Sequence, residues 1–83
     1  MNKSVEEYLK ILYPNIDSLS EEEQKRFDKD KNFLLEFFDE FNKEYNKYLN
    51  QIDNFGEYKF TSIILQMCKD RLDKETIIIN YVQ

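Results

Sequence analysis

Four carboxylates follow one another at helical spacing in the middle of the chain, and they are the residues best placed for chemistry. Glu36, Glu40 and Glu44 lie four residues apart, and Asp39 directly precedes Glu40. On a helix this spacing gathers the four side chains on one stretch of surface. Such a cluster could bind a metal ion or contact a basic surface on another protein.

Metal binding has little support in the rest of the sequence. Carboxylate-bridged metal sites in helical bundles draw acids from several helices and add histidine, and this chain contains no histidine. A calcium loop of the EF-hand type needs a glycine and a closing glutamate at fixed offsets, and no acidic stretch of the sequence supplies them. We therefore expect neither a metal nor a cofactor.

Catalysis lacks its usual groups as well. Cys68 is the single cysteine, and a thiolate nucleophile needs an assisting base that is most often histidine. We expect its thiol to be buried in a helix interface. A pair of catalytic carboxylates of the glycosidase kind needs a cleft that raises one carboxyl pKa, for which 83 residues leave little room. We predict no catalytic residue and do not expect an enzyme.

The carboxylates then form either a solvated helix face, which is the favoured interpretation, or a contact surface. Like charges four residues apart destabilise a helix by only a few tenths of a kcal/mol. This small cost suggests a functional reason for the cluster but does not require one. If the chain has a partner-binding surface, Glu36, Asp39, Glu40 and Glu44 are its predicted residues.

The overall charge narrows the class of partner. Seventeen acids against twelve bases give a net charge of −5, which disfavours direct binding to nucleic acid. Arg26 and Arg71 are the only arginines, so bidentate recognition of phosphates or bases is poorly supplied. An acidic protein is compatible with a basic protein partner, including one that handles nucleic acid. The favoured interpretation is that the net charge serves only to keep the protein soluble.

A heptad of large apolar residues predicts one long central helix. Gaps of four and three place these residues on a single helical face, whereas a strand would send them to both sides. The stripe is wider than a coiled-coil seam and mostly aromatic, so we expect it to be core rather than a ligand groove. The positions are Phe27, Leu34, Phe38, Phe41, Tyr45, Tyr48, Ile52 and Phe55.

This helix is expected to run from about 20 to 54. Ser20 and Glu23 form a capping-box pattern at its start, and Gly56 follows its end. Its length would be about 50 Å, whereas a compact chain of this size is roughly 30 Å across. Either the helix is kinked or broken in the charged stretch 28–32, or it projects and pairs with another chain. Lys31 at a heptad core position favours the break.

Two further helices flank the central one. Ser4 and Glu7 form another capping box, and the helix that they open should stop before Pro14. Residues 57–72 have helical apolar spacing. The β-branched stretch 75–82 has strand composition, but a lone strand leaves its backbone groups unpaired. We expect it to be helical or to lie on the bundle, with addition to a partner's sheet as the less favoured alternative.

Together these patterns predict an all-α protein, a single helical domain over 1–83 built as a small bundle of three to four helices. The longest apolar runs are three residues, far short of the roughly 20 that a membrane span needs. The amino terminus lacks the apolar stretch of a secretory signal, so we expect a cytoplasmic (intracellular) protein with no membrane association.

By exclusion, the favoured function is binding to another protein and modulating it, most simply by inhibition. Inhibitors, antitoxins, immunity proteins and phage anti-defence proteins have this profile of size and charge. The alternative is a structural subunit that forms homo-oligomers, and a homodimer is compatible with both interpretations. No motif in the sequence selects between them.

Overall fold

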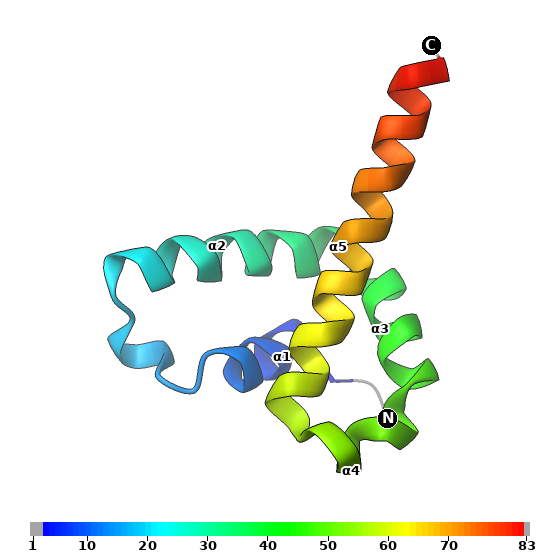
Figure 1. Cartoon of the computed structure of the whole chain (residues 1–83). Helices are drawn as coiled ribbons and strands as arrows, with labels where there is room; N and C mark the ends of the chain where they lie inside the picture. Colours follow the sequence, from blue (N-terminus) through cyan, green and yellow to red (C-terminus); the bar gives the residue numbers. More distant parts are fainter. Residues whose placement is uncertain (1–2, 83) are drawn as a thin grey trace.

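The computed structural model describes the backbone of residues 3–82 and the side chains of residues 3–52 and 54–75. Within residues 3–82 the chain contains helices and no β-strand (Figure 1), which confirms the predicted all-α bundle. The elements in chain order are α1 (Val5–Leu12), η1 (Ile16–Ser18), α2 (Glu21–Glu36), α3 (Phe38–Lys47), η2 (Leu49–Gln51), α4 (Ile52–Phe55) and α5 (Glu57–Val82).

The predicted capping boxes both form. The Glu7 amide donates to Ser4 Oγ at 3.1 Å, and the Ser4 amide donates back to Glu7 Oε1 at 3.1 Å. Ser20 and Glu23 repeat this exchange at the start of α2, at 3.2 and 3.0 Å. Each box satisfies two amides that have no partner inside the helix. Helix α1 ends at Leu12, two residues before Pro14, as predicted.

The central helix is broken, but not where the charge pattern placed the break. Residues 28–32 lie inside continuous helix, and α2 ends at Glu36. Phe37 leaves the helical region at φ −117° and ψ 35°, and α3 begins at the next residue. The segment predicted as one helix over 20–54 is therefore divided among α2, α3, η2 and α4.

The bend at Phe37 directs the apolar face of α3 onto α1 and α5. Tyr8 of α1 makes edge-to-face contacts with Phe41 and Tyr45, at ring-centroid distances of 4.7 and 5.0 Å. Tyr45 in turn contacts Phe60 of α5 at 5.0 Å. The Tyr8 hydroxyl donates a hydrogen bond to Asn42 Oδ1, so the polar end of the buried ring is satisfied. This set of rings is the centre of the core.

The predicted aromatic stripe faces inward over most of its length. Leu34, Phe41 and Tyr45 are buried, whereas Phe55 at the end of the stripe is 40% exposed. Phe27, Phe38, Tyr48 and Ile52 are partly buried against the core. Gly56 has φ +76° and ends α4, as expected for a residue without a β-carbon. It allows the chain to reverse into α5.

Helix α5 is longer than predicted and continues past the other helices. Its backbone is helical from Glu57 to Val82, so the stretch 75–82 is helical rather than extended. In Figure 1 its last turns extend beyond the bundle. The radius of gyration is 13.9 Å, whereas about 12 Å is usual for a compact chain of this length. Whether side chains 76–82 pack on the bundle lies outside the described residues.

The aromatic centre predicts a large stability loss for Phe41→Ala. Phe41 is fully buried, and removing such a ring from a core typically costs about 3–5 kcal/mol, against roughly 4–12 kcal/mol for a whole domain of this size. Urea unfolding followed by circular dichroism measures the change. Leu35→Ala is the control because Leu35 is 60% exposed, and its effect should stay below about 1 kcal/mol. Equal losses in the two variants would contradict this account of the core.

Candidate functional site

The bend at Phe37 separates the four carboxylates that the sequence placed on one helix face. Glu36 is the last residue of α2, and Asp39 and Glu40 lie in the first turn of α3. These three side chains are exposed. Glu44, one turn further along α3, is 7% exposed and belongs to the interior. The predicted surface is therefore reduced to three residues around the bend.

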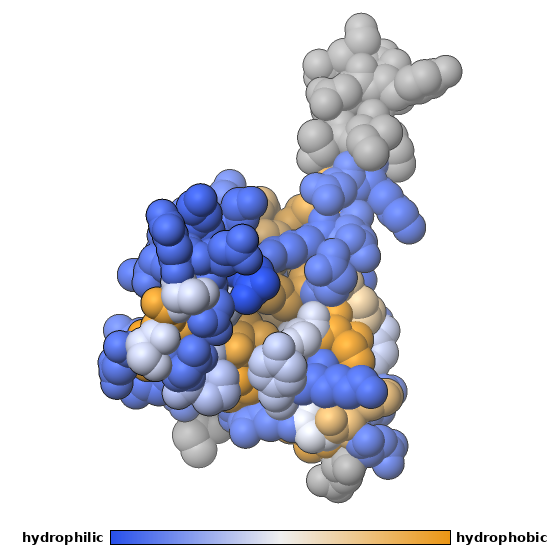
Figure 2. All heavy atoms as spheres, turned by 60° about the vertical axis from the view of Figure 1, so that its left-hand side comes forward, coloured by the Kyte–Doolittle hydropathy of each residue, from blue (hydrophilic) through white to orange (hydrophobic). Residues whose placement is uncertain are grey.

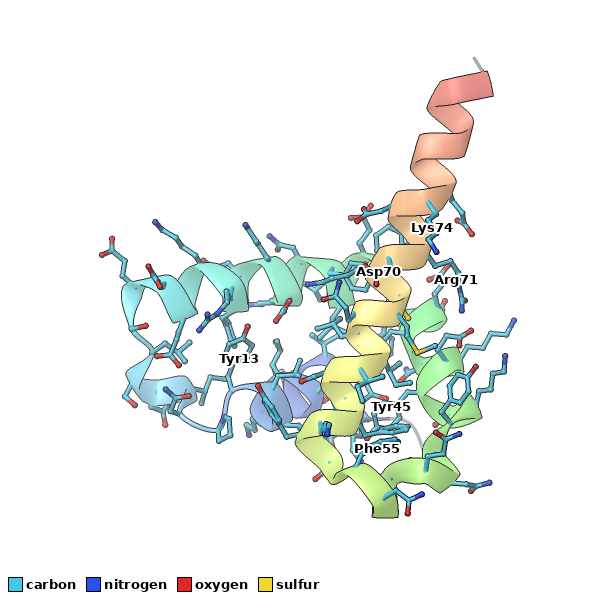
Figure 3. All side chains as sticks on the ribbon, viewed as in Figure 1. Tyr13, Tyr45, Phe55, Asp70, Arg71 and Lys74 are labelled. Carbon is cyan, nitrogen blue, oxygen red and sulfur yellow. The ribbon has the colours of Figure 1, made fainter. Side chains whose placement is uncertain are left out.

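Glu44 makes an internal contact instead of an external one. Its Oε1 accepts a hydrogen bond from Arg71 Nη1 of α5 at 2.9 Å, and this ion pair ties α3 to α5. Figure 3 shows Arg71 on α5, on the side that faces α3. The guanidinium lowers the pKa of Glu44, outweighing the opposite effect of burial. We therefore remove Glu44 from the predicted partner-binding residues.

Two aromatic rings accompany the exposed carboxylates. Phe33 and Phe37 are half-buried, with ring centroids 5.0 Å apart. They line a hollow of about 350 Å³ between α2 and α5, together with Leu72. The Lys69 ammonium lies 5.6 Å from the Phe33 ring centroid. We call this surface the α2–α3 corner, and it consists of Phe33, Glu36, Phe37, Asp39 and Glu40.

A polar contact between α2 and α5 limits the hollow on its other side. Asp30 Oδ1 accepts a hydrogen bond from Lys69 Nζ at 2.6 Å, and Oδ2 accepts one from the Tyr13 hydroxyl at 2.7 Å. One carboxylate thus connects α2 to α5 and to the residue that follows α1. Lys29 and Lys69 line the hollow and also a second, larger opening beyond this contact.

This second opening is a cleft of about 530 Å³ between α2, α5 and the end of α1. Figure 3 shows Tyr13 in the space between α2 and α1, and Figure 2 shows a hollow with an apolar floor among polar side chains. We call it the Tyr13 cleft. Its lining includes Tyr13, Arg26, Lys29, Tyr58, Ser62 and Leu65.

The titratable groups with shifted pKa values have structural explanations. Burial raises the pKa of Tyr13, and the hydrogen bond to Asp30 raises it further. Burial also raises the pKa of Cys68, and the nearby carboxylate of Glu44 adds to the effect. Cys68 is 4% exposed. The prediction that it is a core residue is confirmed, and a thiol held neutral in this way is a poor nucleophile.

The described residues contain neither a cluster of metal-binding side chains nor a membrane-spanning helix. No group of three or more histidine, cysteine, aspartate and glutamate side chains among them is placed to hold a metal ion. None of their helices combines the length and the apolar character that a membrane crossing requires.

Comparison with known proteins adds no family to this description. The chain matches no protein-family model, and neither curated proteins nor solved structures show significant similarity to it.

Sequence reasoning missed Asp30, Tyr13 and Lys69. Asp30 lies in the charged stretch that was expected to break the helix, and its partners are 17 and 39 residues away. The signal in the sequence was weak. Glu23, Arg26 and Asp30 follow one helical face of α2, but this spacing alone does not show what the face meets.

The ion pair of Glu44 predicts a pH-dependent effect of Arg71→Leu. The pKa of Glu44 in the folded protein lies below its ordinary value of 4.5. The pair therefore stabilises the fold above that value, and this contribution is lost as the pH falls through the lowered pKa. Arg71→Leu should lower the urea midpoint at pH 7, and the difference from wild type should shrink as the pH falls below 4.5 and through the lowered pKa of Glu44. A difference that is constant over this range of pH would show that Glu44 is not coupled to Arg71.

Proposed function

We propose that this protein is non-enzymatic and acts by binding another protein through the α2–α3 corner, thereby modulating and most simply inhibiting its partner. The observation that carries the proposal is that exposed carboxylates and half-buried rings lie close together in the sequence around the bend at Phe37. Glu36, Asp39 and Glu40 are exposed, and they adjoin the half-buried rings of Phe33 and Phe37 along the chain.

This combination matches what protein interfaces use. Interface energy concentrates in a few buried aromatic or arginine anchors, and a polar rim surrounds them. The hollow beside Phe33 and Phe37 is about 350 Å³, enough to receive a side chain from a partner. The charged residues that line the hollow are Lys29, Lys69 and Asp73, so the three carboxylates would contact the partner outside it.

The charge of the corner defines the chemistry of the partner. Three carboxylates in a chain of net charge −5 attract a surface rich in lysine and arginine. A protein that handles nucleic acid presents such a surface, and this is the partner class that we favour. The rate of association should then depend strongly on ionic strength.

Charge reversal at the corner tests this proposal. The variant Glu36→Lys/Asp39→Lys/Glu40→Lys should capture at least about tenfold less partner than wild type at low salt. The control variant Glu6→Lys/Asp17→Lys/Asp28→Lys alters three exposed acids outside the corner. It should capture as much partner as wild type. Both variants change the net charge equally. Immobilised wild type and variants are exposed to lysate of the host organism at about 50 mM and about 500 mM salt, and bound proteins are quantified by mass spectrometry.

The outcome separates specific from general charge effects. A protein retained by wild type and by the control variant, but not by the corner variant, supports the proposal. If the corner variant retains the same proteins as wild type, or if both variants lose them equally, the corner is not the interface.

The protruding end of α5 favours a second function, that of a homo-oligomeric structural subunit. The sequence over 76–82 is largely apolar, and its helical backbone extends beyond the bundle in Figure 1. A partner that covers this apolar sequence would stabilise the end of the helix. A second copy of the chain would supply an identical helix, and two-fold dimers are the commonest assemblies.

Sedimentation equilibrium tests the second function. We expect a monomer–dimer equilibrium that reaches a mostly dimeric state at about 100 µM. A single monomeric species across the accessible concentration range would remove this alternative. The same result would not contradict the proposed binding of a partner at the α2–α3 corner.

A further inference from the structure

The Tyr13 cleft is formed by two polar helix faces that do not close on each other. Helix α2 contributes Glu23, Arg26 and Asp30 at spacings of three and four residues. Helix α5 contributes a matching face that begins at Tyr58 and ends at Lys69. The principal packing contacts of α2 are with α1 and α3 rather than with α5. The space between the two faces is therefore held open by the fold.

Both carboxylates in the cleft are fully engaged by the protein. Asp30 accepts from Tyr13 and from Lys69, one donor to each oxygen. Glu23 accepts from the Ser20 amide through Oε1 and from the Asn15 side chain through Oε2, at 3.0 and 3.2 Å. The charge of Asp30 is thus balanced by Lys69, whereas Glu23 is held by two neutral donors and keeps its negative charge.

The donors of the cleft, in contrast, are in excess. Among the described side chains, none accepts a hydrogen bond from Arg26 or Lys29, and both are exposed. Arg26 and Tyr58 line the same cleft as Tyr13. Arg26, Lys29 and Lys69 outnumber the two acids, which makes the cleft locally positive in a protein of net charge −5.

The cleft also offers apolar surface for the body of a ligand. Leu12 and Leu65 are buried and line it, and the Tyr58 ring is 58% exposed. At about 530 Å³ it is within the size range of small-molecule sites. A guanidinium binds carboxylate or phosphate in bidentate fashion, and a neighbouring ammonium adds charge.

We propose that the Tyr13 cleft binds a small anionic molecule, in which a carboxylate or phosphate group is attached to a planar apolar body. Arg26 and Lys29 contact the oxyanion, and Tyr58 covers the apolar part above the floor formed by Leu65. This site lies across the Asp30–Lys69 contact from the hollow beside Phe33 and Phe37, and Lys29 and Lys69 line both openings.

Titration of the ¹⁵N-labelled full chain, observed by amide NMR, tests the site with simple probes. Phenyl phosphate and benzoate carry both features, inorganic phosphate carries only the oxyanion, and benzyl alcohol carries only the ring. We expect phenyl phosphate or benzoate to bind with a dissociation constant in the millimolar range, with shifts concentrated at Tyr13, Arg26, Tyr58 and Ser62. The tighter of the two identifies phosphate or carboxylate as the preferred group.

Matched variants separate specific contact from general charge. Arg26→Gln/Lys29→Gln should weaken the binding of the tighter-binding probe about fivefold or more. The control variant Lys25→Gln/Lys31→Gln removes two exposed cations of the same helix that do not line the cleft. It should leave the affinity for the probe unchanged. Circular dichroism establishes that both variants remain folded.

Three results would overturn the proposal. The first is that neither aromatic anion shifts the amide signals of residues at the cleft. The second is that both double variants weaken binding of the probe equally. The third is that inorganic phosphate or benzyl alcohol binds as tightly as the aromatic anion. Selective weakening by Arg26→Gln/Lys29→Gln, with both simpler probes weaker, supports it.

Discussion

The burial of Tyr8 between three helices is the constraint from which the rest of the arrangement follows. Helix α1 has eight residues, and a helix of this length is not stable alone in water. It is held because the Tyr8 ring contacts Phe41 and Tyr45 and its hydroxyl bonds to Asn42. Helix α3 must therefore face α1 and α5 at once, and the break at Phe37 allows α3 to do so. A straight helix from 20 to 54 would carry Phe41 and Tyr45 away from Tyr8.

The position of α2 depends on polar contacts as well as on apolar burial. Leu34 is its one fully buried residue, and the Phe27 ring adds an edge contact to Tyr13 at 5.4 Å. Asp30 supplies the remaining connection through Tyr13 and Lys69. Charge-assisted hydrogen bonds of this kind fix geometry well. They join α2 to α5 at one point, and openings remain on both sides of Asp30.

What could be predicted from sequence was the part encoded locally. Helix boundaries are set by residues that contact or constrain only their near neighbours in the sequence. The boundaries predicted from Ser4, Pro14, Ser20 and Gly56 are all observed. The break was misplaced because it is a tertiary effect. The charged residues of 28–32 looked less compatible with a helix than Phe37, yet they are exposed or, for Asp30, paired across helices.

The candidate site failed at one residue for the same reason. The helical spacing of Glu44 was correct, but its exposure depends on Arg71, which lies 27 residues later and reaches it only after α5 packs on α3. The sequence pattern of α3 alone does not predict the ion pair with Arg71. Equally, the spacing from Glu36 to Glu44 assumed one straight helix, and the bend at Phe37 invalidates that assumption for Glu36.

The three carboxylates left at the corner are not equivalent. Helix α3 begins at Phe38 without a capping side chain, and Asp39 and Glu40 lie in its first turn, where negative charge stabilises the exposed amides. Part of their presence is explained by the fold. Glu36 lies at the C-terminal end of α2, where the helix dipole disfavours an acid and favours a cation. Because helix stability explains Asp39 and Glu40 but not Glu36, a binding role for the corner is most directly distinguished from a structural one at Glu36.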